Sequence, residues 1–285
     1  MQISVIGLGQ IGSRLAHHLL KADHDISVWN RSPEPVDALV AAGARRSLSA
    51  AEAFQSDVVI SVLFDDAAVR EVLLAPTVLA GAIDNALHIC MSTISPDLGT
   101  LLNTTAKLHG FRYLSAPFFG RPDAAAAANL NILVAGDTKA LSTATPILSL
   151  FGKIWPIGGQ PHHANLAKIA GNYMICCAVE AMSEAAALLT SVGADKAAFL
   201  DMMANSLFSA PIYRRYGPSV AGTSTLPNIG IAIAEKDVGL MNAAAKQTGV
   251  AAPFSAVLAS QFAKVHEIGA HQKDISVALP LALKL

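Results

Sequence analysis

The apolar run Ile3-Ser4-Val5-Ile6 continues directly into Gly7-Leu8-Gly9-Gln10-Ile11-Gly12, a Gly-x-Gly-x-x-Gly turn. Residues 2–6 have strand character and residues 13–21 repeat apolar side chains at helical spacing, so the turn is expected between a strand and a helix. In that setting Gly7 makes the tight turn, Gly9 opens the backbone to a pyrophosphate, and Gly12 lets the helix pack on the strand. The helix start would bind the phosphates through its N–H groups.

This turn predicts a bound dinucleotide, and all six of its residues (Gly7, Leu8, Gly9, Gln10, Ile11 and Gly12) are candidate cofactor-binding positions. The alternative is a glycine-rich turn without a ligand.

A second apolar strand over 26–29 ends in Asn30-Arg31-Ser32, where an NAD site normally has a carboxylate. Arg31 can instead bind a ribose 2′-phosphate, with Asn30 and Ser32 as hydrogen-bond donors. We therefore predict NADP(H), against the alternative of a solvated Arg31.

The amino-acid composition of the chain limits the kinds of partner that it is expected to bind. The 285 residues are 53% hydrophobic and 14% charged, with a net charge of −1. So few charges predict an apolar face buried in a homodimer or larger homo-oligomer. The near-zero net charge predicts neither a nucleic-acid nor a membrane partner. Cys90, Cys176 and Cys177 suit neither a disulfide framework nor a zinc site, and the histidines have no metal-ligand spacing, so we expect a cytoplasmic protein without a metal.

Strands and helices alternate through the first half of the chain, which predicts a doubly wound, mainly parallel α/β sheet. Strands are expected over 26–29, 57–63, 87–91, 111–114, 129–135 and 153–157, and helices over 35–42, 67–74, 96–109 and 139–151. A Gly- and Pro-rich break at 158–161 is followed by helical patterns only, over 163–191, 196–205, 231–247 and 253–267. We therefore predict a nucleotide-binding domain over 1–160 and an all-α domain over 161–285.

Lys168 and Asn172 are four residues apart in the long predicted helix and therefore share one face. A lysine in an otherwise apolar helix can donate a proton to a carbonyl oxygen as hydride arrives, or accept the hydroxyl proton in the reverse direction. Asn172 can hold the same oxygen. From spacing alone, a surface lysine beside a solvent-facing asparagine is an equally good interpretation.

Five motifs follow one another along the chain: the glycine turn, Asn30-Arg31-Ser32, Ser92-Thr93-Ile94-Ser95-Pro96, Lys168-x-x-x-Asn172 and Lys236-Asp237. In their order and approximate spacing they resemble the β-hydroxyacid dehydrogenases, a family that includes 3-hydroxyisobutyrate dehydrogenase and the glyoxylate/succinic semialdehyde reductases. The resemblance covers nearly the whole chain. It implies a Rossmann domain, a helical second domain, and reversible oxidation of a small hydroxy acid by a nicotinamide cofactor.

The resemblance also implies roles for individual residues. Lys168 is the catalytic lysine and Asn172 its substrate-holding partner. Cofactor-binding roles are implied for Leu63, Phe64, Thr93 and Lys236, and substrate-binding roles for Ser92 and Asp237. Lys236 and Asp237 would close the cleft from the second domain; alternatively they are a solvated charged pair on a helix.

The chain departs from the family at the substrate loop, which usually reads Asp-Ala-Pro-Val-Ser-Gly-Gly. Here it is Ser115-Ala116-Pro117-Phe118-Phe119-Gly120-Arg121, so the serine is replaced by Phe119 and the last glycine by Arg121. We expect Phe119, Gly120 and Arg121 to line the substrate site. Arg121 either binds a substrate carboxylate in place of the lost donors or pairs with Asp123 and shapes the turn.

The leading hypothesis is an NADP(H)-dependent oxidoreductase that interconverts a small hydroxy acid, or alcohol, and its aldehyde or keto form. An imine reductase of the same fold is a second hypothesis: Phe118 and Phe119 suit an apolar substrate, but such enzymes commonly lack a lysine at the position of Lys168. A non-catalytic, cofactor-binding interaction protein is the third, against which the retained Lys168 and Asn172 argue.

Overall fold

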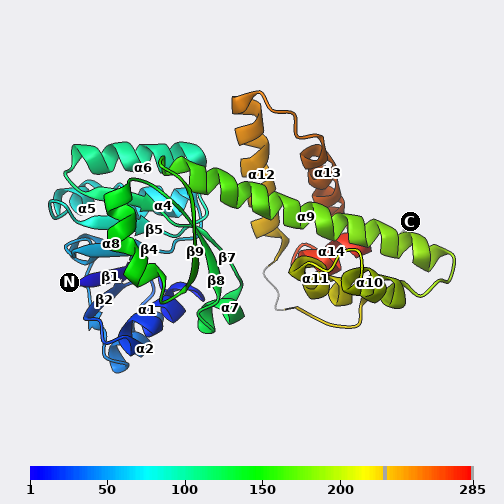
Figure 1. Cartoon of the computed structure of the whole chain (residues 1–285), viewed down its shortest axis with the longest axis horizontal. Helices are drawn as coiled ribbons and strands as arrows, with labels where there is room; N and C mark the ends of the chain where they lie inside the picture. Colours follow the sequence, from blue (N-terminus) through cyan, green and yellow to red (C-terminus); the bar gives the residue numbers. More distant parts are fainter. Residues whose placement is uncertain (227–229, 284–285) are drawn as a thin grey trace. The chain divides into compact units, whose positions relative to one another are not determined.

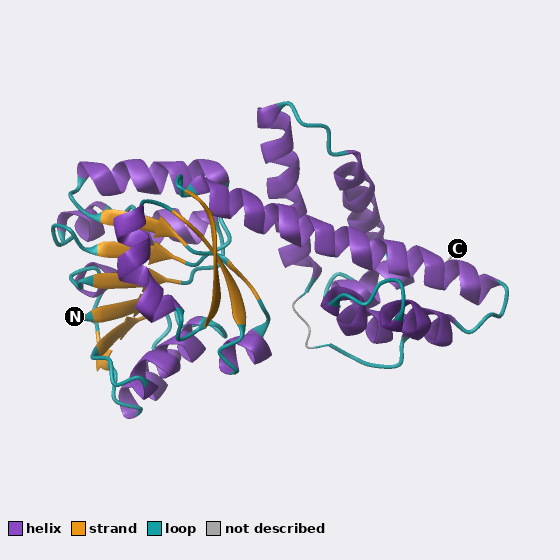
Figure 2. Cartoon of the chain, in the orientation of Figure 1, coloured by secondary structure: helices purple, strands orange, loops and turns teal. Residues whose placement is uncertain are grey.

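A computed structural model of the chain describes residues 1–226 and 230–283. The chain forms two compact units, Met1–Lys168 and Ile169–Leu285. The first unit contains strands flanked by helices, and the described part of the second unit consists of helices joined by loops (Figures 1 and 2). The predicted α/β Rossmann domain followed by an all-α domain is therefore confirmed.

Parallel strands form most of the sheet of the first unit. The strands are β1 (Ile3–Ile6), β2 (Ile26–Trp29), β3 (Arg45–Arg46), β4 (Val58–Ser61), β5 (Leu87–Cys90), β6 (Arg112–Ser115), β7 (Phe118–Phe119), β8 (Leu130–Ala135) and β9 (Gly152–Gly158). Their order is β3-β2-β1-β4-β5-β6-β8-β7, with β9 pairing β8. Strands β1 to β6 run parallel, whereas β8 is antiparallel to both β6 and β7. In register, Ile6 is opposite both Trp29 and Ser61, so the carboxyl ends of β1, β2 and β4 meet at one edge.

Helices cover both faces of this sheet (Figure 2). They are α1 (Gly12–Lys21), α2 (Glu34–Ala41), α3 (Ala50–Ala53), α4 (Asp66–Leu73), α5 (Pro76–Ala80), α6 (Pro96–Leu108), α7 (Pro122–Ala126) and α8 (Thr138–Leu148). Alternate residues of β1 point to opposite faces: Val5 packs in one core with Leu15 of α1, and Ile6 packs in another with Leu98 of α6. Each face buries a continuous apolar cluster, as a doubly wound sheet requires.

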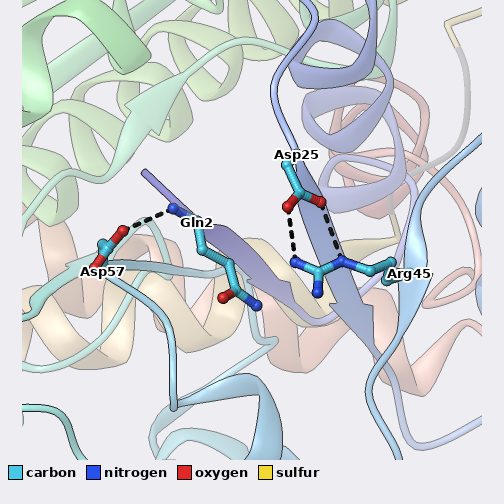
Figure 3. Close-up of polar contacts among 4 residues, drawn as sticks. All are labelled: Gln2, Asp25, Arg45 and Asp57. Carbon is cyan, nitrogen blue, oxygen red and sulfur yellow. Dashed lines mark hydrogen bonds and ion pairs between the residues drawn. The ribbon is translucent and has the colours of Figure 1, made fainter.

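Polar contacts fasten the amino ends of the strands, at the edge opposite the glycine turn (Figure 3). Asp57, just before β4, accepts a hydrogen bond of 2.8 Å from the Gln2 N–H. Arg45 of β3 donates two hydrogen bonds of 3.0 Å each to the carboxylate of Asp25. A bidentate contact of this kind has fixed geometry, although its exposure limits its contribution to stability. The carboxyl ends of the strands remain for ligand binding.

The second unit is built on the long helix α9 (His162–Ser191), which begins in the first unit. The other helices are α10 (Lys196–Asn205), α11 (Pro211–Ala221), α12 (Ile231–Thr248), α13 (Pro253–Glu267) and α14 (Ile275–Ala282). Val179 of α9 packs with Leu258 of α13 and Leu279 of α14 in the core of this unit. Within the described residues, α9 is the one helix long and apolar enough to be a candidate membrane span by length and composition, a test that a core helix also passes.

The expected long helix over 163–191 is confirmed, and α10 and α13 have the predicted bounds. Two helices of the second unit, α11 and α14, were not predicted, and each contains an internal proline, Pro218 and Pro280. Proline lacks the N–H that a helix interior uses, so its presence lowers the apparent helical propensity of both segments. In the first unit the short elements β3, α3, α5 and β7 were also not predicted, because they offer too few residues to show a period.

Candidate active site

The glycine turn has the geometry that a dinucleotide requires. Gly7 follows β1 with φ of +91°, and a Cβ there would lie 2.3 Å from the Val62 carbonyl oxygen. A Cβ on Gly12 would lie 1.9 Å from the Gly7 carbonyl oxygen, so helix α1 approaches the turn closely. A Cβ on Gly9 would meet nothing within 4 Å. The turn is therefore packed at Gly7 and Gly12 and open at Gly9, the position predicted to face the pyrophosphate.

The start of α1 is suited to an anion. Its N-cap residue, Ile11, provides no side-chain hydrogen bond to the helix, and the first turn contains no acidic residue. The Ser13 hydroxyl donates to the Leu8 carbonyl oxygen over 2.7 Å, which fixes the turn from within. The positive end of the helix dipole then favours a phosphate at this point.

Asn30 connects the glycine turn to the loop after β2. Its Oδ1 accepts a hydrogen bond of 3.0 Å from the Leu8 N–H, and its Nδ2 donates to the Ser32 carbonyl oxygen over 3.1 Å. The Gly7 N–H also donates to the Trp29 carbonyl oxygen, over 3.0 Å. Arg31 lies exposed on the turn that Asn30 holds. The three predicted residues Asn30, Arg31 and Ser32 thus lie beside the glycine turn, with Asn30 positioning the other two.

The loops after β4 and β5 are joined by Ser92. Its hydroxyl oxygen accepts a hydrogen bond of 2.8 Å from the Leu63 N–H, and the side chain is buried. Leu63 and Thr93 are half-buried, while Phe64 is exposed. Leu63, Phe64, Ser92 and Thr93 therefore all follow strands that end at the same edge as the glycine turn. The hydrogen bond gives Ser92 a positioning role, and its binding of substrate remains a prediction.

Asp66 is a residue that the sequence did not single out. Its carboxylate accepts hydrogen bonds from the Ser95 N–H, over 2.8 Å, and from the Ser95 hydroxyl. The Ser95 hydroxyl oxygen in turn accepts from the Leu98 N–H over 3.2 Å and so caps α6. Asp66 thereby fixes the turn that contains Thr93. The acidic residue in the first turn of α4 was the available signal, but its partner lies 29 residues away.

The expected substrate loop contains the short strand β7, in which Phe119 pairs with Asn131 of β8. Gly120 follows with φ of +146°, and a Cβ there would lie 2.5 Å from Cδ2 of Leu130. Glycine is thus required immediately after Phe119. Arg121 is buried and directly precedes α7.

Lys168 is not the solvated surface lysine that spacing alone allowed. Its relative exposure is 8%, and its Nζ lies 4.1 Å from the centroid of the Phe119 ring. This contact joins α9 to β7 within the first unit. The predicted catalytic lysine and the ring that replaces the family's serine are therefore in direct contact.

In the second unit a buried carboxylate links the other predicted residues. Asp237 of α12 has a relative exposure of 2%. Its Oδ2 accepts a hydrogen bond from the Asn172 Nδ2, and its Oδ1 lies 3.1 Å from the Lys236 Nζ. Burial first, and then the charge of Asp237, raise the pKa of the Cys176 thiol to about 12, so this cysteine stays protonated. Lys236 and Asp237 form an ion pair whose acidic member is buried rather than solvated.

The two histidines at the start of α9 pack edge to face. The rings of His162 and His163 lie 4.6 Å apart between centroids, and burial followed by the charge of His163 lowers the pKa of His162. Across residues 1–226 and 230–283, no group of three or more His, Cys, Asp or Glu side chains gathers where it could hold a metal ion.

Two family models match nearly the whole chain. Residues 2–159 match the NAD binding domain of 6-phosphogluconate dehydrogenase. Residues 163–282 match the model described as NAD-binding of NADP-dependent 3-hydroxyisobutyrate dehydrogenase.

Individual proteins are similar over comparable lengths. An uncharacterized oxidoreductase of Bacillus subtilis, YfjR, is 36% identical over 92% of this chain and 93% of its own length. An NAD-dependent L-serine dehydrogenase of Pseudomonas aeruginosa is 29% identical over 98% of this chain and 97% of its own. The solved structure of Mycobacterium tuberculosis 3-hydroxyisobutyrate dehydrogenase with L-serine superposes with a TM-score of 0.90, at 28% identity, over 99% of both chains.

Proposed function

Since the chain belongs to the β-hydroxyacid dehydrogenase family, we propose that it interconverts a small β-hydroxy acid and the corresponding aldehyde or keto acid with NADP(H). The coarser activity follows from the family: the protein is an oxidoreductase that acts on a CH–OH group and binds a nicotinamide dinucleotide. The choice of NADP(H), the lysine mechanism and the substrate are our proposals.

The buried Lys168 carries the mechanistic proposal. When bound, the nicotinamide supplies or accepts the hydride. In reduction, the Lys168 ammonium donates a proton to the carbonyl oxygen, and in oxidation the neutral amine accepts the hydroxyl proton. A buried ammonium suits this role because the surrounding protein excludes water from the proton transfer. Asn172 follows one helical turn later in α9 and is assigned to a substrate oxygen, with Asp237 fixing its amide.

We infer the class of substrate from the names of two similar proteins. One is named an L-serine dehydrogenase, and the mycobacterial 3-hydroxyisobutyrate dehydrogenase structure was determined with L-serine. Serine and 3-hydroxyisobutyrate share a three-carbon β-hydroxy acid skeleton. We assign the carboxylate to Arg121, which can bind it bidentately from a buried position. Ser92, Phe119 and Gly120 are assigned to the surrounding substrate wall.

Removing Lys168 tests the mechanism. Lys168→Ala should lower kcat by about 10²–10⁴-fold, the usual contribution of general acid–base catalysis. Lys168→Arg should not restore activity, because a guanidinium does not release its proton at working pH. NADPH affinity, measured by fluorescence titration, is the control and should survive in both variants. A near-normal kcat for Lys168→Ala on the best β-hydroxy acid would overturn the assignment.

Removing Arg31 tests the cofactor. Arg31 is exposed beside the glycine turn, where a guanidinium can bind the 2′-phosphate. Arg31→Ala should weaken NADPH binding by about 1.5–3 kcal/mol and leave NADH binding nearly unchanged. Equal losses for the two cofactors would assign Arg31 a role other than 2′-phosphate recognition.

Reduction of an imine is the second candidate, favoured by the aromatic ring of Phe119 at Lys168. Two structural neighbours named imine reductases, from Myxococcus stipitatus, have identities of 19% and TM-scores of 0.67 and 0.66, so these two show a shared fold alone. A third, from Pseudomonas sp., has an identity of 25% and a TM-score of 0.63. A panel of β-hydroxy acids, aldehydes and cyclic imines, followed through NADPH absorbance, separates the two candidates. Imine reduction would be favoured if the protein turns over imines and the Lys168→Ala variant does so at the full rate.

We also propose that the protein forms a homodimer or larger homo-oligomer. Large apolar side chains are exposed on the helical unit, among them Met174, Leu188, Phe254 and Val257. Exposed apolar side chains in this number are typical of a surface that is covered in an assembly.

A further inference from the structure

Phe119 lies where the family usually has a serine, and its ring contacts the predicted catalytic group directly. The Lys168 Nζ is 4.1 Å from the ring centroid, well inside the range of a cation–π interaction. Because Lys168 is also buried, little water competes for this contact. An aromatic ring attracts an ammonium through its quadrupole and does not attract a neutral amine in the same way. The contact therefore positions the Lys168 side chain and also favours its charged form.

The structure holds this ring firmly. Backbone pairing with Asn131 fixes Phe119 in β7, and the left-handed Gly120 fixes the turn that follows. The ring packs in a small cluster with Leu133 and Ala135 of β8 and with Ala164 of α9, and Ala167 lies against the same cluster. The small alanine side chains let the helix and the ring approach each other. The ring is thus a fixed platform for the lysine that follows Ala167.

Phe118, the preceding residue, provides an internal comparison. Successive residues of a strand point to opposite faces, and Phe118 packs against the large core formed by β1, α1 and α8. The two phenylalanines have the same size and lie in the same two-residue strand, but one of them contacts Lys168 and the other contacts the sheet core.

We propose that Phe119 is a positioning residue for catalysis, which binds the Lys168 ammonium on its ring and holds it for proton transfer. This inference rests on the proposed function, in which Lys168 donates and accepts the proton. It predicts that an aromatic ring, and not merely an apolar side chain, is required at position 119.

Three variants test whether position 119 needs a ring or only an apolar side chain. Phe119→Leu keeps an apolar side chain without a ring, and Phe119→Tyr keeps the ring. Phe118→Leu is the matched control. Phe119→Leu should lower kcat by about 5–30-fold, which is the rate equivalent of a desolvated cation–π contact. NADPH affinity should change less than twofold. Phe119→Tyr should retain most of the activity, and Phe118→Leu should reduce stability more than kcat.

A second measurement reports on Lys168 without turnover. Lysine acylation needs the neutral amine, so its rate at Lys168, read by peptide mass spectrometry across a pH series, has a midpoint that depends on the ring. Phe119→Leu should move that midpoint to lower pH by about 0.5–1 unit, and Phe119→Tyr should leave it in place. A midpoint unchanged in Phe119→Leu, or equal shifts in Phe119→Leu and Phe118→Leu, would overturn the proposal.

The two proposals fail in distinguishable ways. If Lys168→Ala is fully active, the proposed function fails, while the acylation midpoint still reports whether the ring binds the ammonium. If Lys168→Ala is inactive and Phe119→Leu matches the unmodified protein in kcat and midpoint, the proposed function stands and the positioning role of Phe119 is wrong.

Discussion

The loops at the carboxyl edge of the sheet in the first unit and the predicted site residues of the second unit are held by different means. In the first unit backbone N–H groups fix the loops: Gly7 donates to Trp29, Leu8 to Asn30 and Leu63 to Ser92. In the second unit the contacts join side chains, because Asp237 binds both Asn172 and Lys236.

This difference decides which substitutions each unit tolerates. A site built on backbone geometry depends on residues without side chains, so its sensitive positions are glycines, and an exposed neighbour such as Arg31 tolerates substitution without loss of the fold. A site built on side chains depends on one buried carboxylate, and any change to it affects two partners together.

Among the substitutions that test this contrast, the largest effect is expected at Gly12. A Cβ there would lie 1.9 Å from the Gly7 carbonyl oxygen, and since both groups belong to the backbone, α1 must move away from the turn. Gly12→Ala should weaken NADPH binding at least about 100-fold, because a shift near 1 Å misplaces the phosphate-binding N–H groups. The melting temperature should fall as well, since overpacking of this kind costs about 1–3 kcal/mol.

Gly9→Ala is the matched control, because its Cβ meets nothing within 4 Å. This substitution should leave the melting temperature unchanged. It should still weaken NADPH binding, because the added methyl group occupies the approach to the pyrophosphate. Unchanged affinity in Gly9→Ala would show that the pyrophosphate does not lie at this position.

Asp237 tests the side-chain site. Asp237→Asn keeps the shape but removes the charge that holds both Asn172 and Lys236. A hydrogen bond to a charged group contributes about 1.5–3 kcal/mol, so kcat should fall by about 10–100-fold. The control is Glu235→Gln on the same helix, whose carboxylate contacts His266 over 2.7 Å outside the site. Equal kcat values for the two variants would show that Asp237 does not position Asn172.

The first unit was the easier one to predict from sequence. The Gly-x-Gly-x-x-Gly turn, the strand that precedes it and the alternation of strands and helices lie in short continuous stretches, and the doubly wound sheet follows from them. In the second unit α10 and α13 were predicted with their bounds, whereas α11 and α14, which contain Pro218 and Pro280, were not.

The contacts of the site were harder to predict than its residues. Lys168, Asn172 and Asp237 were candidates from their motifs, but the contact of Lys168 with Phe119 joins residues 49 positions apart, and that of Asn172 with Asp237 joins residues 65 apart. Neither pair leaves a periodic pattern in the sequence, because its two residues belong to different elements that meet only in the tertiary structure. Asp66 was missed for the same reason.

The smallest predicted effect concerns buried ionisable groups. One such group in each unit has a pKa that burial shifts, and the two groups differ in their hydrogen bonding. In the first unit His88 shares a hydrogen bond of 2.8 Å with Ser61, and burial lowers its pKa to about 3, so it is neutral. In the second unit Glu180 of α9 has a relative exposure of 5%, and no residue of the described part of the chain hydrogen-bonds its carboxyl oxygens. Burial first, and then the charge of Glu184, raise the pKa of Glu180 to about 7, against a smaller opposing effect of Lys264.

The sign of the effect on stability follows from linkage. Between its ordinary pKa of 4.5 and about 7, Glu180 is protonated in the folded protein and ionised in the unfolded chain. The unfolded state therefore binds fewer protons, and the free energy of unfolding falls as pH rises through this window. Glu180→Gln removes the titration, so its stability relative to the unmodified protein should rise by about 2 kcal/mol between pH 5 and pH 8. Urea unfolding at the two pH values measures the change, with Glu267→Gln, at an exposed position of α13 in the same unit, as the control. A difference that is independent of pH would show that Glu180 is already ionised in the folded unit, and the contrast with the neutral His88 would be lost.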